Sequence, residues 1–343
     1  MRKIKVLVVE DSAFFRGLLV KHLNSDPALE VVASANDPFE ARDMIVKYKP
    51  DVMTLDIEMP RMNGIEFLRK LMPQYPMPVV MISSLSDKVF EALNAGAVDF
   101  VAKPAMTDRK KLEELMKNEL PVKIKIASTA KISNIKRNTV PVLTETVSTN
   151  VNKDLVLAIG ASTGGTEAIA TVLKEFGTDI PGTVIVQHMP AGFTEMYANR
   201  LNDQCRVTVK EAKDGDKVLP GQVLIAPGGD CQMRLVKVNG VYQVEVKPGP
   251  KVSGHCPSVD VLFESVAQAA GSRAIGVILT GMGGDGAKGL LEMRKAGAKT
   301  IGQDESTCVV YGMPKVAFDI GAVEYQEKLS DIAKKTYAIL NNM

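Results

Sequence analysis

Three reactive side chains in the C-terminal half each follow a short apolar run that reads as a strand. They are Ser162, His188 and Asp285, which lie at the ends of LVLAIGAS, just after GTVIVQ, and at the end of AIGVILTGMGGD. If these runs are neighbouring parallel strands, their carboxyl ends meet at one edge of the sheet. There the serine would be a nucleophile, the histidine the base that takes its proton, and the carboxylate the group that orients the histidine. The pattern therefore predicts a hydrolase.

The surroundings of Ser162 fit a Gly-x-Ser-x-Gly turn between a strand and a helix, because Gly160 and Gly164 flank it. The helical periodicity of residues 166–176 predicts the helix, whose N-terminal amides would stabilise an oxyanion during acyl transfer. A phosphate-binding loop or an ordinary tight turn would give the same pattern. The order Ser, His, Asp differs from that of α/β-hydrolases, but triads are defined by geometry, so the order excludes families and not the mechanism.

The chain has three histidines, which limits the choice of base. His22 lies in a helix-like stretch and is expected to be a solvated helix residue. His188 precedes Met189-Pro190, where a helix cannot continue, and is the predicted base. His255 is the competing base, and its alternative role is the entry to a helix that starts near Pro257. Asp285 has an alternative role too, as the N-cap of a helix that follows it, and one carboxylate can serve both purposes.

Polar residues also follow the predicted strands of the N-terminal half. Alternating strand-like and helical segments predict a doubly wound parallel sheet there. Several carboxylates at one sheet edge repel each other without a cation, and Mg²⁺ prefers such oxygen ligands. A lysine and a small hydroxyl beside that ion would bind phosphoryl oxygens. The strand-like runs at 3–9, 51–55, 78–82 and 99–102 lead into Glu10 and Asp11, Asp56, Ser83, and Lys103. Taken singly, each of these residues would be interpreted as a helix cap or a surface charge.

These residues, at this spacing, resemble the receiver domain of two-component response regulators over about the first 105 to 120 residues. The resemblance implies that Asp56 accepts a phosphoryl group from a histidine kinase and that Glu10, Asp11 and Asp56 hold Mg²⁺. Phe100 stands where tyrosine is common and cannot make a hydroxyl hydrogen bond, and Glu10 stands where aspartate is common. The residues that correspond to the receiver switch are Ser83, Phe100 and Lys103.

The C-terminal half resembles the CheB family of chemotaxis protein-glutamate methylesterases. The resemblance implies that Ser162, His188 and Asp285 hydrolyse glutamate methyl esters on methyl-accepting chemotaxis receptors, and it extends to deamidation of some receptor glutamines. Amides near Thr163 and Met282 would line the oxyanion site. The motifs, in this order behind a receiver, are IGASTGGTEA, VQHMP, LIAPGG, PSVDVLF, TGMGGDG and YGMPK. One departure is Cys256, where an arginine is expected in many relatives.

By the same resemblance, the chemotaxis kinase CheA is the phosphodonor, and ester hydrolysis needs no cofactor. The unphosphorylated receiver is expected to cover the catalytic face, and charge added at Asp56 should shift that docking equilibrium. A second class stays open, a binding module whose glycine-rich loops hold a ligand without breaking a bond. A transcription factor is disfavoured because the C-terminal half has neither a helix-turn-helix pattern nor a basic stripe.

At 343 residues the chain is too long for one ordinary core, so two domains are expected. We predict an α/β protein with a doubly wound, flavodoxin-like receiver at 1–120 and a Rossmann-like, mostly parallel methylesterase domain at 151–343. Residues 121–150, rich in polar residues, would form a linker, either a solvated tether or an ordered strap. Asn239-Gly240 predicts a β-hairpin with a type I′ turn, which would make the second sheet mixed.

Composition argues against nucleic-acid binding, a cysteine metal site and a membrane span. A net charge of +2 gives no strong attraction to nucleic acid. The four cysteines are scattered without metal-binding spacing and fit reduced cytosolic thiols. Since no apolar run approaches the length of a membrane span, we expect a cytoplasmic protein without membrane insertion.

Overall fold

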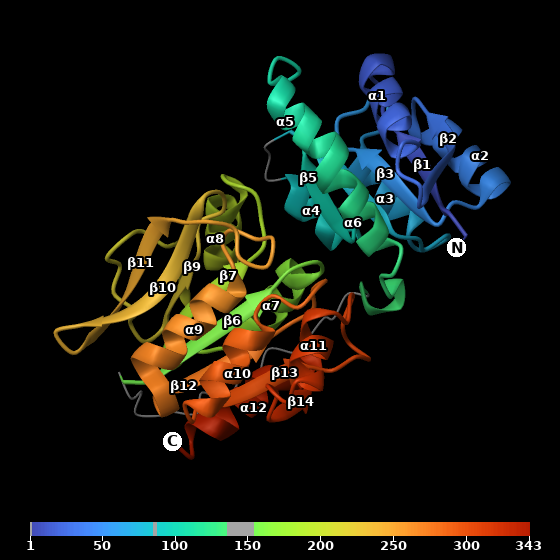
Figure 1. The fold of residues 1–343 in the computed structure, drawn as a ribbon. Coiled ribbons are helices and arrows are strands. Elements are labelled where there is room, and N and C mark those ends of the chain that lie inside the picture. Colours follow the sequence, from blue (N-terminus) through green and yellow to red (C-terminus); the bar gives the residue numbers. More distant parts are fainter. Residues whose placement is uncertain (1, 85–87, 136–153) are drawn as a thin grey trace. The chain divides into compact units, whose positions relative to one another are not determined.

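The computed structural model describes residues 2–84, 88–135 and 154–343 and divides into two compact units, Met1–Arg137 and Asn138–Met343 (Figure 1). Each unit is a parallel sheet with helices, so the predicted α/β fold class is confirmed. Within the described ranges, no helix is long and apolar enough to cross a membrane.

The N-terminal unit is built on a five-stranded sheet with the order β2-β1-β3-β4-β5, in which every pairing is parallel. This is the flavodoxin-like order, in which ligands bind beyond the carboxyl ends of the central strands. The strands are β1 (Ile4–Val9), β2 (Leu29–Ala35), β3 (Val52–Asp56), β4 (Val79–Ser83) and β5 (Asp99–Ala102). The first helices are α1 (Ala13–Leu23), α2 (Pro38–Tyr48), α3 (Gly64–Leu71) and α4 (Lys88–Asn94).

The last helical stretch of this unit runs further than the sequence predicts. It consists of α5 (Arg109–Glu114), a π-helical segment (Leu115–Glu119) and α6 (Leu120–Ala127). Residues 121–127, predicted as the start of the linker, therefore lie in a helix that packs into the unit, since the side chains of Ile124 and Ala127 are fully buried. Pro121 does not stop the helix; it is the second residue of α6 and directly follows the π-helical segment, where the regular hydrogen-bond pattern of the α-helix is already interrupted. Residues 136–150 of the predicted linker lie outside the described residues.

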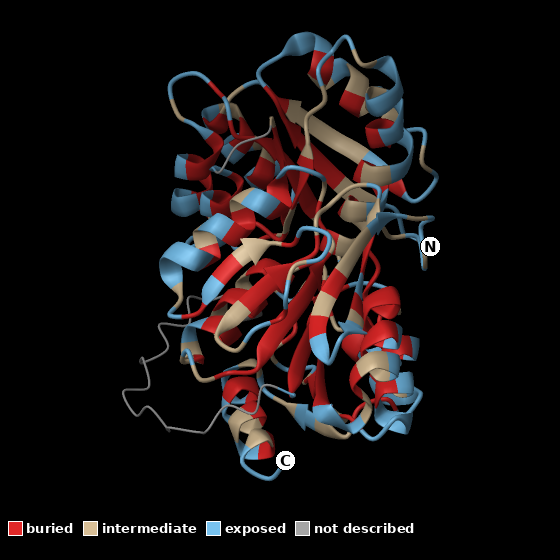
Figure 2. Ribbon diagram, turned by 90° about the vertical axis from the view of Figure 1, so that its left-hand side faces the viewer, coloured by how far each residue is buried: buried red, intermediate tan, exposed pale blue. Residues whose placement is uncertain are grey.

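The C-terminal unit has a seven-stranded, fully parallel sheet with the order β14-β13-β12-β6-β7-β9-β8. Its central strands are buried along their whole length (red in Figure 2), as expected for a sheet covered on both faces. The strands are β6 (Val156–Ala161), β7 (Gly182–Gln187), β8 (Thr208–Glu211), β9 (Gln222–Ile225), β12 (Ala274–Ile278), β13 (Lys299–Gln303) and β14 (Tyr325–Glu327). The helices are α7 (Gly165–Glu175), α8 (Phe193–Gln204), α9 (Val259–Ala270), α10 (Ala287–Lys295), α11 (Met313–Asp319) and α12 (Ile332–Leu340).

The predicted hairpin is present as β10 (Cys231–Val238) and β11 (Val241–Pro248). Asn239 and Gly240 have φ angles of 50° and 83°, the positive values that a type I′ turn requires. The expectation of a mixed sheet is wrong, because the hairpin forms a two-stranded sheet of its own. The apolar face of the hairpin packs on α9 and is part of the core of the unit. The hairpin strands therefore pair with each other and not with an edge strand of the seven-stranded sheet.

The strand order determines where a functional site can form at the edge of this sheet. From β6 in the middle of the sheet, the chain first builds β7, β9 and β8 on one side and then returns to build β12 on the other. The carboxyl ends of β6, β7 and β12 therefore lie at a topological switch point, where open α/β sheets bind their ligands.

Candidate functional site

The register of β6 and β7 places Ser162 and His188 side by side. Ala161 pairs with Gln187, and the His188 N–H donates to the Ala161 carbonyl at 3.1 Å. The Ser162 N–H donates to the carbonyl of Thr280 at 3.0 Å, which ties the serine to the loop after β12. The buried Gln187 carboxamide donates to the carbonyls of Ser162 (2.9 Å) and His188 (3.1 Å). The three predicted strand ends thus converge.

The turn after Ser162 is closed by the Gly165 N–H, which donates to the Ser162 carbonyl at 2.7 Å. The positive φ angle of this turn, 76°, falls on Gly164, and α7 starts at the next residue. A Cβ atom on Gly281 would lie 2.7 Å from Ser162 Cβ, so the glycine allows the loop after β12 to approach the serine closely.

His188 is held at one edge by Asp285. The distance from His188 Nε2 to Asp285 Oδ2 is 2.7 Å, and both side chains are buried. His188 Nδ1 is also buried and has no hydrogen-bond partner among the described residues. In a neutral imidazole whose Nε2–H donates to a carboxylate, Nδ1 carries the lone pair. This arrangement leaves Nδ1 able to accept a proton.

Asp285 is itself held by the start of α9. Its carboxylate accepts hydrogen bonds from the Ser258 hydroxyl (2.6 Å) and from the N–H groups of Val259 (2.8 Å) and Asp260 (3.1 Å). The alternative role of Asp285 as the cap of the helix that follows it is wrong, since it caps α9 and not α10. Sequence alone does not single out Ser258, because a serine before a helix ordinarily caps that helix with its own hydroxyl.

Asp260, in α9, makes the reciprocal contact with the start of α10. Its Oδ1 accepts the N–H of Gly289, in the first turn of α10, at 2.9 Å. Each carboxylate therefore caps the helix to which the other is attached, and α9 and α10 lie side by side (Figure 1). Burial would raise the pKa of Asp285, but the hydrogen bond and charge of His188, together with the hydrogen bonds from Ser258 and Val259, outweigh burial and lower that pKa to about 2. Burial raises the pKa of Asp260, and the negative charge of Asp285 adds to this rise.

We predict that Asp285 stabilises the fold above about pH 4 and loses this effect in acid. Its folded pKa of about 2 lies below the usual 3.8, so its contribution is complete above 3.8 and disappears as the pH falls through about 2. The difference corresponds to about 2 kcal/mol. Urea unfolding of wild type and Asp285→Asn at about pH 6 and about pH 2.5 should show a gap in unfolding free energy that shrinks in acid. A gap independent of pH would contradict this role.

The other residues predicted near this site lie around the same strand ends. Thr163 is buried, whereas the Met282 side chain is exposed and its N–H has no hydrogen-bond partner within the described part of the chain. Their oxyanion role stays a prediction. His255, the competing base, lies with its ring stacked on that of His188, with centroids 3.7 Å apart and an interplanar angle of 9°. His22 lies in α1 of the other unit.

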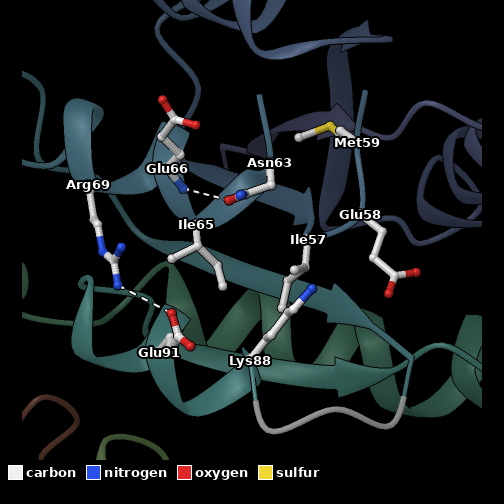
Figure 3. Close-up of a pocket in the computed structure, with 9 residues that line it drawn as sticks. All are labelled: Ile57, Glu58, Met59, Asn63, Ile65, Glu66, Arg69, Lys88 and Glu91. Carbon is white, nitrogen blue, oxygen red and sulfur yellow. Dashed lines mark hydrogen bonds and ion pairs between the residues drawn. The ribbon is translucent and has the colours of Figure 1, made fainter. Parts of the chain in front are cut away.

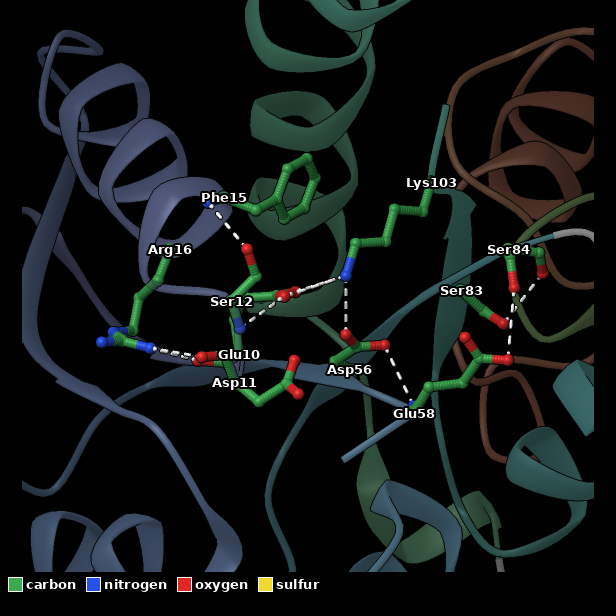
Figure 4. A network of polar contacts seen from close by, with 10 residues as sticks. All are labelled: Glu10, Asp11, Ser12, Phe15, Arg16, Asp56, Glu58, Ser83, Ser84 and Lys103. Atoms are coloured by element: carbon green, nitrogen blue, oxygen red, sulfur yellow. Dashed lines mark hydrogen bonds and ion pairs between the residues drawn. The ribbon is translucent and has the colours of Figure 1, made fainter. Parts of the chain in front are cut away.

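Two acidic residues of the N-terminal unit, Glu10 and Asp56, contact Lys103 (Figure 4). Its Nζ lies 2.7 Å from Asp56 Oδ2 and 2.9 Å from both carboxylate oxygens of Glu10. Glu10 and Asp56 are buried and Asp11 is exposed, and the three residues offer oxygen atoms within 4.8 Å of one another. Three carboxylates at this spacing fit a hard divalent cation such as Mg²⁺.

Electrostatics also favour a cation at this cluster. Burial and the negative charge of Asp56 raise the pKa of Glu10 to about 7, although Lys103 opposes the rise. Burial acts to lower the pKa of Lys103, but its hydrogen bonds to Asp56 and Glu10 outweigh burial and raise it. One lysine therefore does not fully offset the carboxylates, and a divalent ion would.

The predicted switch residues lie in or directly after β4 and β5, and one of them, Lys103, is part of this cluster. Ser83 is buried, and its hydroxyl donates to the Ser84 carbonyl at 2.9 Å. The Lys103 N–H donates to the Ser83 carbonyl at 2.6 Å, which links the two strand ends. Phe100 is buried in β5. The switching role of these residues stays a prediction.

A pocket of about 490 Å³ opens near α3 and α4 of the same unit (Figure 3). Glu58 lines it and donates its N–H to Asp56 Oδ1 at 3.1 Å, and Ile57 also lines it, so the pocket begins at the residue after the predicted phosphoacceptor. None of the predicted site residues lines it. Its walls are Ile57, Glu58, Met59, Asn63, Ile65, Glu66, Arg69, Lys88 and Glu91.

Comparison with known proteins gives the same division of the chain. Residues 157–336 match the family model described as CheB methylesterase, and residues 6–117 match that of the response regulator receiver domain. A protein-glutamate methylesterase/protein-glutamine glutaminase of Syntrophomonas wolfei is 62% identical, over 100% of this chain and 99% of that relative. One of the same name from Syntrophotalea carbinolica is 52% identical, over 99% and 98%.

Among solved structures, the CheB methylesterase catalytic domain of Thermotoga maritima is similar to the C-terminal unit. It is 38% identical, with a TM-score of 0.53, and the match covers 54% of this chain and 98% of that domain. The family, the fold class and the enzyme class predicted from the sequence are thus confirmed. The chain belongs to the CheB methylesterase family, and it is a hydrolase with an N-terminal receiver domain.

Proposed function

We propose that this hydrolase demethylates glutamate methyl esters on methyl-accepting chemotaxis receptors, deamidates receptor glutamines, and is activated by phosphorylation of Asp56. The observation that carries the catalytic part is the buried His188–Asp285 pair on a strand end next to that of Ser162. Relatives at 62% and 52% identity are named for both activities, which supports the choice of substrate. The enzyme would act in the cytoplasm, in keeping with cysteines that form no disulfide among the described residues.

The first half of the reaction transfers the acyl group to Ser162. Its Oγ attacks the γ-carbonyl carbon of the methylated glutamate while Nδ1 of His188 takes the hydroxyl proton. The carbonyl oxygen becomes an oxyanion, for which the amides near Thr163 and Met282 are the proposed donors. The bond to the methoxy group then breaks, and His188 returns the proton to it, so methanol leaves.

The second half regenerates the enzyme. Water attacks the acyl carbon, His188 takes a proton from the water, and the Ser162 oxygen leaves with that proton, which releases glutamate. A receptor glutamine passes through the same steps and releases ammonia in place of methanol. Throughout, Asp285 holds Nε2 of His188 and stabilises the imidazolium. Methanol release from methylated receptor, compared between wild type and Ser162→Ala, tests this assignment.

In the receiver unit, an Asp56 oxygen would attack the phosphorus of a phosphohistidine on the kinase CheA, and the P–N bond would break, so that the kinase imidazole leaves and Asp56 carries an acyl phosphate. Glu10, Asp11 and Asp56 would hold Mg²⁺, which when bound neutralises charge on the transferred phosphoryl group. Lys103, already 2.7 Å from Asp56, would pair with a phosphoryl oxygen. The ester hydrolysis itself would use groups of the protein and water, without a cofactor.

We predict that a small phosphodonor with Mg²⁺ raises methanol release by wild type about 5–150-fold, the usual range of a coupling free energy, and does not stimulate Asp56→Asn. The amide cannot form the acyl phosphate, so no charge is added. Chelation of Mg²⁺ should abolish the stimulation. Asp43→Asn, at an exposed ion pair with Arg42 on α2, is the matched control and should respond like wild type. Equal stimulation of Asp56→Asn would exclude Asp56 as the phosphoacceptor.

A further inference from the structure

We propose that His255 is a positioning residue for His188: its stacked ring holds the imidazole in the plane in which Nε2 meets Asp285 and Nδ1 stays able to accept the serine proton. The inference rests on the proposed function of Ser162, His188 and Asp285. It extends that function to a second histidine, which acts through His188 and does not itself react.

The geometry of the two rings carries the first step. Their centroids are 3.7 Å apart and their planes are nearly parallel, at 9°, so one face of His188 is in van der Waals contact with His255. The hydrogen bond to Asp285 fixes one edge of the His188 ring, at 2.7 Å, but a single bond does not prevent rotation of the ring about it. Contact with the ring face prevents that rotation. Edge and face together define the position of Nδ1.

His255 is presented by a tight two-residue turn. Val252 and His255 exchange N–H···O hydrogen bonds of 2.9 Å in both directions. Ser253 and Gly254 between them have φ angles of 52° and 84°, as a type I′ turn requires. The Ser253 hydroxyl donates to Asp260 Oδ2 at 3.3 Å, which attaches the turn to α9. The backbone at His255 is therefore fixed on both sides.

Gln232 of β10 connects His255, which contacts the ring face of His188, with Asp285, which holds the ring edge. Its buried carboxamide donates to the carbonyls of Pro250 (2.9 Å) and His255 (3.5 Å), so it anchors the His255 loop. The same carboxamide accepts the Ser258 N–H at 2.8 Å, and the Ser258 hydroxyl donates to Asp285. One side chain thus joins both supports of His188. A residue that merely filled space would not require this shared anchor.

The test compares two replacements of His255 in the full-length protein. His255→Ala removes the ring, whereas His255→Phe keeps a flat ring for the face of His188 without an imidazole. For each variant we would measure kcat and KM for methanol release from methylated receptor. We would also measure the rate at which a fluorophosphonate labels Ser162, a reaction in which the serine oxygen bonds to phosphorus and fluoride leaves. Thermal unfolding would show whether each variant is folded, and Ser162→Ala serves as the reference for loss of the nucleophile.

We expect His255→Ala to lower kcat by about 10–100-fold with KM nearly unchanged, because a misplacement of about 1 Å costs that much. Labelling of Ser162 should slow by a similar factor, since it needs the same base but no receptor. His255→Phe should recover most of both rates. Wild-type rates in a folded His255→Ala, or equal losses in both variants, would overturn the positioning role. Methanol release by Ser162→Ala would instead overturn the proposed function, which separates the two failures.

Discussion

Ser162→Ala should lower methanol release from methylated receptor by about 10⁴-fold or more. The variant has no oxygen with which to form the acyl-enzyme, and residual turnover would depend on water and the oxyanion donors alone. The loss should appear in kcat, because the methyl ester is still bound. Deamidation of receptor glutamine should disappear in parallel, since both reactions use the same nucleophile.

The variant should remain folded. The contacts of Ser162 that hold the strand ends together are made by its backbone, to Thr280, Gln187 and Gly165, and alanine keeps them. Ser330→Ala, at an exposed serine of the same unit, is the matched control and should retain full activity. Equal methanol release by Ser162→Ala and wild type would exclude Ser162 as the nucleophile and favour a binding module.

Asp285→Asn should lower kcat on the order of 10³–10⁴-fold, although the side chain keeps its shape. The carboxylate accepts the proton on Nε2 of His188, at 2.7 Å. An asparagine whose NH₂ faced Nε2 would donate instead, and the imidazole would then carry its proton on Nδ1. In that tautomer Nδ1 cannot take the proton of Ser162, so the base is disabled without being displaced.

Asp260→Asn is a demanding control for this experiment. Asp260 is also buried, also caps a helix of this pair, and donates its own backbone N–H to Asp285. Asparagine can still accept the Gly289 N–H through its carbonyl oxygen, so we expect a loss of about tenfold or less. Similar losses in both variants would show that helix capping, and not the tautomer of His188, determines the activity.

The parts of this protein that sequence predicts best depend on local order along the chain. Strand ends follow from apolar runs, so Asp56, Ser162 and His188 could be assigned to sheet edges before their neighbours were known. The hairpin at Asn239-Gly240 is equally local, because two residues determine its turn. The roles assigned to the site residues, including Thr163 and Met282, and the domain limits at 120 and 150 stay predictions.

What sequence did not predict depends on packing between distant segments. Ser258 and Gln232 reach the site because α9 and the β10–β11 hairpin pack together, and the sequence periodicity does not indicate such a contact. The same packing explains the wrong expectation of a mixed sheet, since α9 covers the hairpin. Likewise the helix runs past residue 120 because the unit has room to bury Ile124, which is a property of its core.

The exchange of caps between Asp285 and Asp260 has a consequence for molecules that are only partly folded. If α9 has not docked, Asp285 loses the Ser258 hydroxyl and two amide partners at once, and only its hydrogen bond to His188 is left to orient it. The nucleophile can therefore be activated only after two helices and the hairpin behind them have assembled. A nascent or damaged chain would expose Ser162 without a working base. An incompletely folded chain is therefore inactive and does not hydrolyse esters indiscriminately.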